Sequence, residues 1–475
     1  MDHTSIAIVG GGLSGTLTAI HLLRTAREAT TVYLIEKEPR KMHRGVAYSS
    51  SLPFQPLNVP AARMTLFPEM PHHFLDWLTE HQPVYPTLLP DPISPDSFVP
   101  RCVFGDYVED CLAVAEADAL KGVRLVRLTQ EVLAVEKRGK NYSFAVSLRN
   151  GSQVMAQKVV LALGNLPPAD LPIPNKAFYQ SPLYKASPWS PEILNALPAH
   201  APVLLLGSSL TMVDLVGSLV KKGHQGKIYV VSRHGLLPQT HQVDAVPYPL
   251  APVRLQRPLS PLKAMRLLRK EVRKAAQEGY AWHSVVDALR DSLSGIWHNF
   301  SFQEKKQFLR HVKPYWEIHR HRMPLASSLM LRQLQEKGQL EVKAASLVDL
   351  HANGKMVHAE IRERGNTGTQ ILEVAMVINC TGPLCDYTKS KDPLVQQLLS
   401  EGLICPDDLK MGVTATPAGN LLNAEGLPIE NLFTLGPPLK GLLYESTALR
   451  EIRHQAASLA SLLLFGEAML EAALP

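Results

Sequence analysis

Short apolar runs that end at glycine alternate along the chain with stretches of helical periodicity. Residues 6–9 are continuously apolar, which predicts a strand buried on both faces, and the run ends at Gly10. Residues 13–27 then show a helical pattern, and residues 31–35 are again apolar. This order predicts a β–turn–α–β unit with parallel strands.

The same succession returns near the middle of the chain. Residues 203–206 predict a buried strand, residues 207–212 a turn, residues 213–222 a helix and residues 227–232 the next strand. With Gly207 aligned on Gly10, the strand ends fall at the same interval in both copies. We therefore expect two dinucleotide-binding units in one chain.

Between and beyond these units the pattern changes. Strands are expected at 123–128 and 158–163, with an antiparallel meander at 131–136, 142–148 and 153–155. Helices are expected at 74–78, 105–116, 261–279, 282–294 and 302–312, and around 316–323. Later strands are expected at 340–350, 356–362, 371–378, 413–416 and 431–435, before a last helix that runs to about residue 465. Ser446 or Thr447 is the expected N-cap of that helix.

These elements predict an α/β protein with two Rossmann-like domains, a small antiparallel sheet and a helical insertion in the second domain. We expect the first part of one dinucleotide-binding domain at 1–195 and a second dinucleotide-binding domain at 200–375, with the insertion at about 250–325. The last part of the first domain is expected at 376–475.

Composition narrows the class of protein. The chain has 475 residues, 45% of them hydrophobic and 19% charged, as expected for a globular protein of more than one domain. The net charge of +6 is mild for this length and does not indicate nucleic acid. Five cysteines without C-x-x-C spacing give no sign of a disulfide framework or a metal site. We expect a cytoplasmic protein without signal peptide or membrane span.

The glycines of the first turn predict a phosphate-binding loop. Gly10, Gly12 and Gly15 have G-x-G-x-x-G spacing between a strand and a helix, and Glu36 ends the next strand about 20 residues further on. A carboxylate there can hold an adenosine ribose by both hydroxyls, which predicts a bound dinucleotide. The alternative is a glycine turn of any doubly wound fold.

The second turn differs from the first at the glycine positions and at the acid of the motif. Ser209 and Met212 replace the second and third glycines, and Ser232 and Arg233 stand where the first copy has its acid. Because an arginine pairs with a 2′-phosphate that a carboxylate would repel, this site predicts NADPH rather than NADH. The alternative is that Arg233 is a solvated surface residue.

Two basic stretches belong to the predicted insertion. The helix at 261–279 carries several basic residues, which are either a solvated face or an anion or partner site. The segment 316–323 is dense in hydrogen-bond donors, which could hold a phosphate or carboxylate, or bind the last carbonyls of its helix.

Several motifs make the chain resemble the two-dinucleotide-binding-domain flavoproteins, in particular the family labelled FAD-NAD(P)-binding protein. Besides the first glycine turn and Glu36, these are Gly45-Val-Ala-Tyr48, Leu57-Asn-Val-Pro60, His319-Arg-His-Arg-Met323, Asn379-Cys-Thr-Gly-Pro383 and Tyr444-Glu-Ser-Thr-Ala448 with Glu451-Ile-Arg453. The resemblance implies FAD, NAD(P)H and redox chemistry. Distant relatives are N-hydroxylating flavin monooxygenases, including aspartate N-oxygenases that form nitrosuccinate. One departure is Pro437 after Gly436, where the superfamily often has an aspartate for the ribityl chain.

Motifs and resemblance together give the expected contact residues. For FAD they are Gly10, Gly12, Leu13, Ser14, Gly15, Glu36, Lys37, Gly45, Tyr48, Asn58, Met64, Val132, Gly164, Gly436, Tyr444, Glu445 and Thr447. For NADP they are Gly207, Ser208, Ser209, Leu210, Thr211, Ser232, Arg233, Thr381 and Gly382. Candidate substrate contacts are Arg44, His319, Arg320 and Arg322, and the catalytic residues are unknown.

The expected activity is that of an FAD-dependent NAD(P)H oxidoreductase, with hydride passing from NADPH to flavin N5. In a monooxygenase, dioxygen would then form a C4a-hydroperoxide that oxygenates a small amine or other nucleophile. The protein is also a candidate for homodimer formation. One rival is a disulfide reductase, which needs a cysteine pair beside the flavin. Another is an FAD- and NAD(P)-binding redox sensor or partner protein without turnover. An amine oxidase with a single dinucleotide domain is disfavoured by the second unit.

Overall fold

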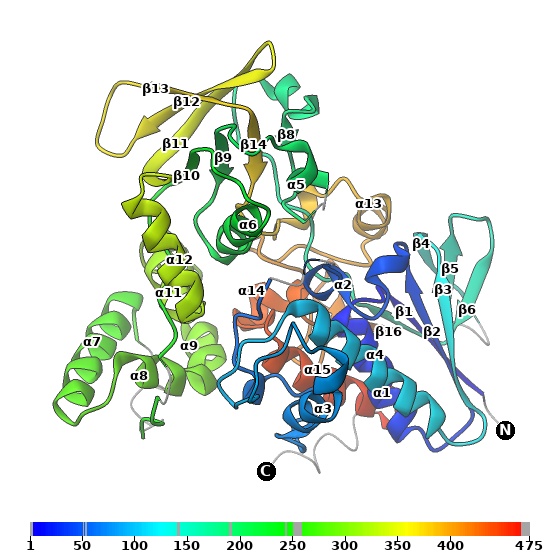
Figure 1. Cartoon of the computed structure of the whole chain (residues 1–475). Helices are drawn as coiled ribbons and strands as arrows, with labels where there is room; N and C mark the ends of the chain where they lie inside the picture. Colours follow the sequence, from blue (N-terminus) through cyan, green and yellow to red (C-terminus); the bar gives the residue numbers. More distant parts are fainter. Residues whose placement is uncertain are drawn as a thin grey trace. The chain divides into compact units, whose positions relative to one another are not determined.

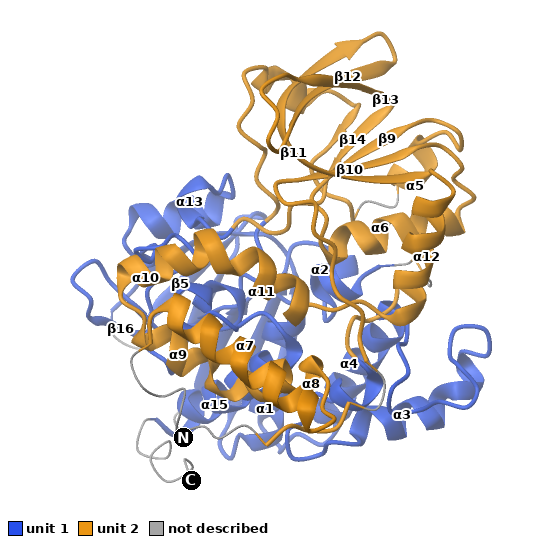
Figure 2. Cartoon of the chain, turned by 90° about the vertical axis from the view of Figure 1, so that its left-hand side faces the viewer, with its two compact units in different colours: residues 1–50, 60–166, 385–475 blue, residues 51–59, 167–384 orange. Residues whose placement is uncertain are grey.

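The computed structural model describes residues 3–50, 52, 55–139, 143–189, 192–242, 245–249 and 259–466. Residue 142, at the start of a predicted strand, residues 250–258 of the predicted insertion and residues 467–475 lie outside this description. The chain forms two compact units (Figures 1 and 2). Unit 1 comprises residues 1–50, 60–166 and 385–475, and unit 2 comprises residues 51–59 and 167–384.

Unit 1 is built on a six-stranded sheet in the order β15-β16-β7-β1-β2-β3. The strands from β16 to β3 are parallel, and β15 is antiparallel at the edge. A separate antiparallel sheet contains β4, β5 and β6, as predicted. The bounds are β1 Thr4–Val9, β2 Thr30–Glu36, β3 Val123–Thr129, β4 Val132–Lys137, β5 Phe144–Leu148, β6 Gln153–Ala156, β7 Lys158–Leu161, β15 Asn420–Leu422 and β16 Pro428–Thr434.

Three helices of unit 1 pack together around α1. α1 packs against α4 and α15, and the side chains that face the sheet from α1 are fully buried. The bounds are α1 Leu13–Thr25, α2 Gly45–Tyr48, α3 His73–His81, α4 Arg101–Ala117, α13 Pro393–Ser400, α14 Lys440–Leu443 and α15 Leu449–Phe465. Helix α13 was not predicted from the sequence. Asp392 caps it and Pro393 occupies its first position, which is a recognisable start signal.

Unit 2 repeats this design around β9. Its seven-stranded sheet has the order β13-β12-β11-β10-β9-β14-β8, and the strands from β11 to β8 are parallel. The strand β9 is buried throughout because it has neighbours on both sides and cover on both faces. The bounds are β8 Tyr184–Lys185, β9 Val203–Leu206, β10 Ile228–Ser232, β11 Leu340–Asn353, β12 Met356–Glu363, β13 Gln370–Val374 and β14 Met376–Asn379.

The long strand β11 belongs to two layers. Its first residues pair with β10, and its later residues pair with β12 in an antiparallel meander. Apolar side chains of the meander and the parallel sheet share one core, which includes Leu204, Val231, Leu350 and Val357. The meander therefore folds back over the sheet, and a single predicted strand at 371–378 becomes two strands, β13 and β14, joined at Ala375.

The predicted insertion is helical. A serine N-cap begins α7, where Ser260 accepts from the Lys263 amide, and a capping box of Ser301 and Glu304 begins α10. The helices of unit 2 are α5 Glu192–Ala196, α6 Leu210–Lys221, α7 Pro261–Gln277, α8 Trp282–Ala288, α9 Leu293–Asn299, α10 Phe302–Gln307, α11 Lys313–Arg320 and α12 Leu325–Glu336. The helix predicted at 282–294 is broken into α8 and the start of α9.

Some predicted boundaries differ from the structure. Residues 167–195 and 376–384 lie in unit 2, because β8 and β14 hydrogen-bond within its sheet. The strand predicted at 413–416 is wrong, since this segment makes only isolated bridges. Across the described residues, no helix combines the length and the apolar character that a bilayer span requires.

Candidate dinucleotide-binding sites

The turn after β1 requires glycine at two positions. Gly10 has φ +109°, and a Cβ there would overlap the carbonyl group of Ala162 at the end of β7. A Cβ at Gly15 would overlap the Gly10 carbonyl oxygen, because α1 starts directly against the turn. No side chain caps α1, so the amide groups of its first turn are available to a phosphate.

Glu36 supports this turn from the end of β2. Its carboxylate accepts hydrogen bonds from the backbone N–H of Gly11 and of Glu38, both at 3.1 Å. The Gly11 position is close to the Glu36 side chain, so the acid and the phosphate turn are neighbours. This is the arrangement in which a ribose and its pyrophosphate can be held together.

Two distant segments reach the same place in unit 1. The Gly45 Cα lies 3.1 Å from where a Cβ of Gly12 would be, and the Ser14 hydroxyl lies 2.9 Å from where a Cβ of Gly436 would be. The Gly436 N–H donates to the side chain of Gln455 on α15, at 2.7 Å. Sequence-predicted FAD contacts from three parts of the chain are thus brought together at the N-terminus of α1.

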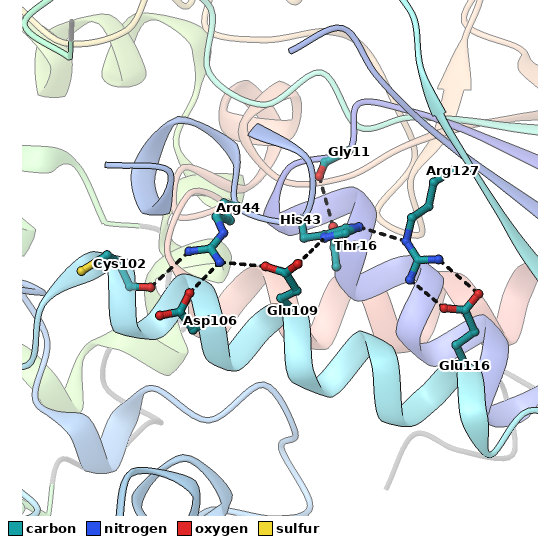
Figure 3. Close-up of polar contacts among 9 residues, drawn as sticks. All are labelled: Gly11, Thr16, His43, Arg44, Cys102, Asp106, Glu109, Glu116 and Arg127. Atoms are coloured by element: carbon teal, nitrogen blue, oxygen red, sulfur yellow. Dashed lines mark hydrogen bonds and ion pairs between the residues drawn. The ribbon is translucent and has the colours of Figure 1, made fainter. Parts of the chain in front are cut away.

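A charged network lies beside the turn (Figure 3). The His43 N–H donates to the Gly11 carbonyl at 2.7 Å, and Arg127 Nε on β3 donates to His43 Nε2 at 3.2 Å. Arg127 also binds both carboxylate oxygens of Glu116, at 3.1 and 2.7 Å. Burial, and then the charge of Arg127, lower the pKa of His43, so the neutral ring accepts this hydrogen bond.

Arg44, a predicted substrate contact, belongs to the same network. Its Nη2 lies 2.6 Å from Asp106 Oδ1 and 2.7 Å from Glu109 Oε2, both on α4 (Figure 3). Its Nη1 donates to the Cys102 carbonyl oxygen at 3.4 Å. The guanidinium therefore connects the start of α2 to α4. No spacing in the sequence predicted these contacts.

The remaining predicted FAD contacts are distributed around unit 1. Tyr48 is buried with its ring 4.7 Å from that of Phe104, and Met64 and Val132 are also buried. Lys37 pairs with Asp392 at 3.1 Å, and Gly164 has φ +63° with open space where a Cβ would be. Asn58, in contrast, belongs to unit 2, where its carbonyl accepts from His241 Nε2 at 2.9 Å.

The segment before α15 contains a strained turn. Tyr444 has φ +61° and ψ −54°, and the Glu445 N–H donates to the Leu443 carbonyl at 2.8 Å, which makes a γ-turn with positive φ. Tyr444, Glu445 and Ser446 are buried, while Thr447 is partly exposed. The predicted N-cap is wrong: Ala448 is the N-cap, and no side chain caps α15, because the helix begins later than its polar residues suggest.

The second turn follows β9 and copies the first in its backbone. Gly207 has φ +105°, and a Cβ there would lie 2.5 Å from the Cys380 carbonyl oxygen at the end of β14. The Gly207 N–H donates to the Val231 carbonyl at 2.8 Å, as Gly10 does to Ile35 at 2.9 Å. Met212 is fully buried, and Ser209 is the N-cap of α6 without a side-chain hydrogen bond.

Side chains around this turn hold the β10 end in place. Ser208 Oγ lies 2.8 Å from Ser232 Oγ, whose oxygen also accepts from the Gly235 N–H at 3.1 Å. Arg233 is exposed. On the other side of β9, the fully buried Asn379 accepts from the Thr381 hydroxyl at 2.6 Å, which orders the loop that contains Gly382. Leu210 and Thr211 form the first turn of α6.

The other substrate candidates lie on or after α11 in unit 2. His319 Nδ1 is 2.7 Å from the Tyr315 carbonyl, and its ring meets Trp282 edge-on. Arg322 is buried, pairs with Asp287 and lies over the Trp282 ring. Arg320 is partly exposed at the last residue of the helix. Arg322 therefore holds α8 to the segment at the end of α11. This structural role does not depend on what His319 and Arg320 contact.

Comparisons with known proteins agree with this reading of the fold. Residues 7–166 match a family model described as FAD-NAD(P)-binding. This confirms the predicted class of binding domain. The fold is that of the two-dinucleotide-binding-domain flavoproteins. No curated protein sequence matches the chain.

Three solved structures illustrate the similarity. The ornithine N-hydroxylase of Kutzneria sp. 744, solved with reduced FAD, NADP⁺ and L-ornithine, has a TM-score of 0.62 at 15% identity, over 98% of this chain and 99% of that one. Ornithine hydroxylase from Pseudomonas aeruginosa has a TM-score of 0.62 at 14% identity, over 98% and 99%. The FAD-bound cadaverine monooxygenase of Erwinia amylovora has a TM-score of 0.59 at 13% identity, over 98% and 95%.

Proposed function

We propose that this protein is an FAD-dependent NAD(P)H oxidoreductase of the monooxygenase type, which oxygenates a small amine or another nucleophile. The observation that carries the proposal is the pair of equivalent turns at Gly10 and Gly207, each against the end of a neighbouring parallel strand. Opposite charges follow them, the carboxylate of Glu36 and the guanidinium of Arg233. This difference suits one site to FAD and the other to NADPH.

The residues of unit 1 fit FAD. Glu36 would bind the adenosine ribose, the uncapped first turn of α1 would bind the pyrophosphate, and Gly12, Gly45 and Gly436 leave room for the backbone to approach it. In unit 2 the first turn of α6 would bind the NADPH pyrophosphate, and Arg233 its 2′-phosphate. Bound flavin would supply hydride acceptance and oxygen activation, and the protein would position both nucleotides and limit water access.

The monooxygenase assignment rests on the fold neighbours, which include an ornithine N-hydroxylase and a cadaverine monooxygenase. A small amine is therefore the proposed substrate class. His319 and Arg320 stay candidate contacts for a substrate carboxylate. Arg44 and Arg322 already bind carboxylates of the chain itself, so we place them in positioning roles.

The disulfide-reductase alternative finds little support in the cysteines. Cys380 is 1% exposed, and burial raises the pKa of its thiol, which disfavours the reactive thiolate. A sensor without turnover is favoured by one feature, the buried Met212 at the third glycine position of the second turn. A bulky residue there changes how closely α6 approaches the strand end, and weak nucleotide binding would follow.

Anaerobic stopped-flow mixing of the FAD-loaded protein with NADPH or NADH tests the proposal. Fast loss of the visible flavin absorbance with NADPH, and slow loss with NADH, is expected. After air is admitted, an oxygenated flavin species that can be observed before reoxidation would support a monooxygenase. Immediate reoxidation without such a species would point to a reductase or oxidase. No reduction by either nucleotide would leave the sensor alternative.

The cytoplasmic location and the homodimer also remain proposals. Five cysteines without C-x-x-C spacing suggest the location. Cell fractionation tests the first, and light scattering of the purified protein tests the second.

A further inference from the structure

Arg364 reaches the end of β10 from a different part of unit 2. Ser232, the last residue of β10, pairs with Ala344 on β11, and the next residue of β11, Ala345, pairs with Glu363 at the end of β12. The Arg364 N–H continues this register with a 2.7 Å hydrogen bond to the Ala344 carbonyl. The β11–β12 meander thus delivers Arg364 beside the segment that contains Arg233.

Contacts on both sides of Ala344 fix this arrangement. Gly235 has φ +61°, and a Cβ there would lie 3.1 Å from the Ala344 N atom, so the loop after β10 is pressed against β11. The side chains also meet, since Arg364 Nη1 lies 3.3 Å from His234 Nδ1. Burial lowers the pKa of His234, and the charges of Arg364 and Arg233 lower it further.

Positive charge is in excess at the end of β10. In the part of the chain that the structure describes, neither Arg233 nor Arg364 forms a salt bridge with a carboxylate. Two acids of the adjoining strands are already engaged, since Glu363 on β12 and Glu341 on β11 bind Lys343 at 2.9 and 2.7 Å. Arg364 contacts His234, and the charge of Arg233 also acts on this ring. Two exposed arginines so close to one histidine repel each other and are stabilised by an anion.

We propose that Arg364 is a second cation for the 2′-phosphate of NADPH, which acts with Arg233 and sets the preference for NADPH over NADH. This inference rests on the proposed function, because it requires a nucleotide in unit 2. A phosphate monoester carries up to two negative charges and three acceptor oxygens, which one arginine cannot fully satisfy. Arginines from β10 and from the meander can approach such a group from two directions.

The strand that leads to Arg364 offers a matched control. Arg362 is an exposed arginine on β12, two residues before Arg364, and its partner on β11 is Ser346, away from the β10 end. The variant Arg362→Ala removes the same charge two residues before Arg364. A nonspecific effect of net charge would change both variants alike, whereas a 2′-phosphate contact would change only Arg364→Ala.

The experiment measures dissociation constants of NADP⁺, NAD⁺, 2′,5′-ADP and 5′-AMP by calorimetry with the FAD-loaded wild type, Arg364→Ala, Arg364→Lys and Arg362→Ala. We expect Arg364→Ala to weaken NADP⁺ and 2′,5′-ADP about tenfold or more, with NAD⁺ and 5′-AMP unchanged. Arg364→Lys should restore part of the loss, and Arg362→Ala should bind as the wild type does.

The outcomes separate this inference from the proposed function. If the wild type binds NADP⁺ more tightly than NAD⁺ and Arg364→Ala binds as the wild type does, the role of Arg364 is overturned and the proposed function is not. Equal losses for NADP⁺ and NAD⁺ would show a purely structural role and overturn it as well. A wild type that binds none of the four nucleotides would overturn both proposals. Thermal unfolding of each variant establishes that it is folded.

Discussion

The Gly11 backbone N–H donates a 3.1 Å hydrogen bond to the Glu36 carboxylate, so the acid at the end of β2 holds the phosphate turn that follows β1. The Gly11 position is also crowded by the Glu36 side chain. The two parts of the proposed FAD site are therefore coupled. A substitution at Glu36 acts on the ribose contact and on the shape of the turn together.

Replacement of Glu36 by alanine should weaken FAD binding about tenfold to a hundredfold, because hydrogen bonds to a charged group are lost. Titration of the FAD-free protein by flavin fluorescence measures this change. The control is Glu38→Ala, since exposed Glu38 binds Lys41 at 2.5 Å and does not contact the turn. Normal FAD affinity in Glu36→Ala would contradict the assignment of the ribose site.

Replacement of Gly15 by alanine should destabilise unit 1 by about 3 kcal/mol or more, because the new Cβ would overlap the Gly10 carbonyl oxygen of a rigid turn. Flavin content and denaturant unfolding measure the effect. Gly139→Ala is the matched control, as open space surrounds its Cβ position and its φ is not positive. If both variants unfold alike, the close approach at Gly15 is unimportant.

Unit 1 should lose stability in mild acid through His21. Burial lowers the pKa of this ring to about 4 from 6.5, so the unfolded chain takes up the proton first. The free energy of unfolding keeps its full value well above pH 6.5 and falls as the pH is lowered towards 4. At pH 5 the loss is about 2 kcal/mol.

The variant His21→Leu isolates this effect from that of other histidines. Urea unfolding at pH 7 and pH 5, at equal FAD loading, should show a smaller loss for His21→Leu than for the wild type. The same pH dependence in both proteins would mean that His21 is protonated without penalty, contrary to its burial against the Phe67 ring.

Replacement of Arg44 by alanine should lower the melting temperature and the FAD affinity together, because Arg44 holds the segment of Gly45 to Asp106 and Glu109. Differential scanning calorimetry and flavin titration measure the two effects. Arg40→Ala is the control, since Arg40 is exposed at a neighbouring turn. A raised substrate KM with unchanged melting and FAD affinity would instead restore the sequence prediction that Arg44 contacts substrate.

Local rules explain what could be predicted from the sequence. Gly10 and Gly207 require positive φ, and continuous apolar strands mark a sheet that is covered on both faces, so both phosphate turns were recognisable. Neither the N-cap at Ala448 nor the γ-turn at Tyr444 follows such a rule. Both depend on how the segment is packed between α14 and α15.

The two Rossmann-like units and the opposite charges of Glu36 and Arg233 could be recognised without a structure, because each depends on residues within one β–α–β span. The contact of Arg44 with α4 and that of Arg364 with His234 became visible only in the folded chain. These contacts join residues that are far apart in the chain. Strand register and helix packing create them, and no local spacing encodes either one.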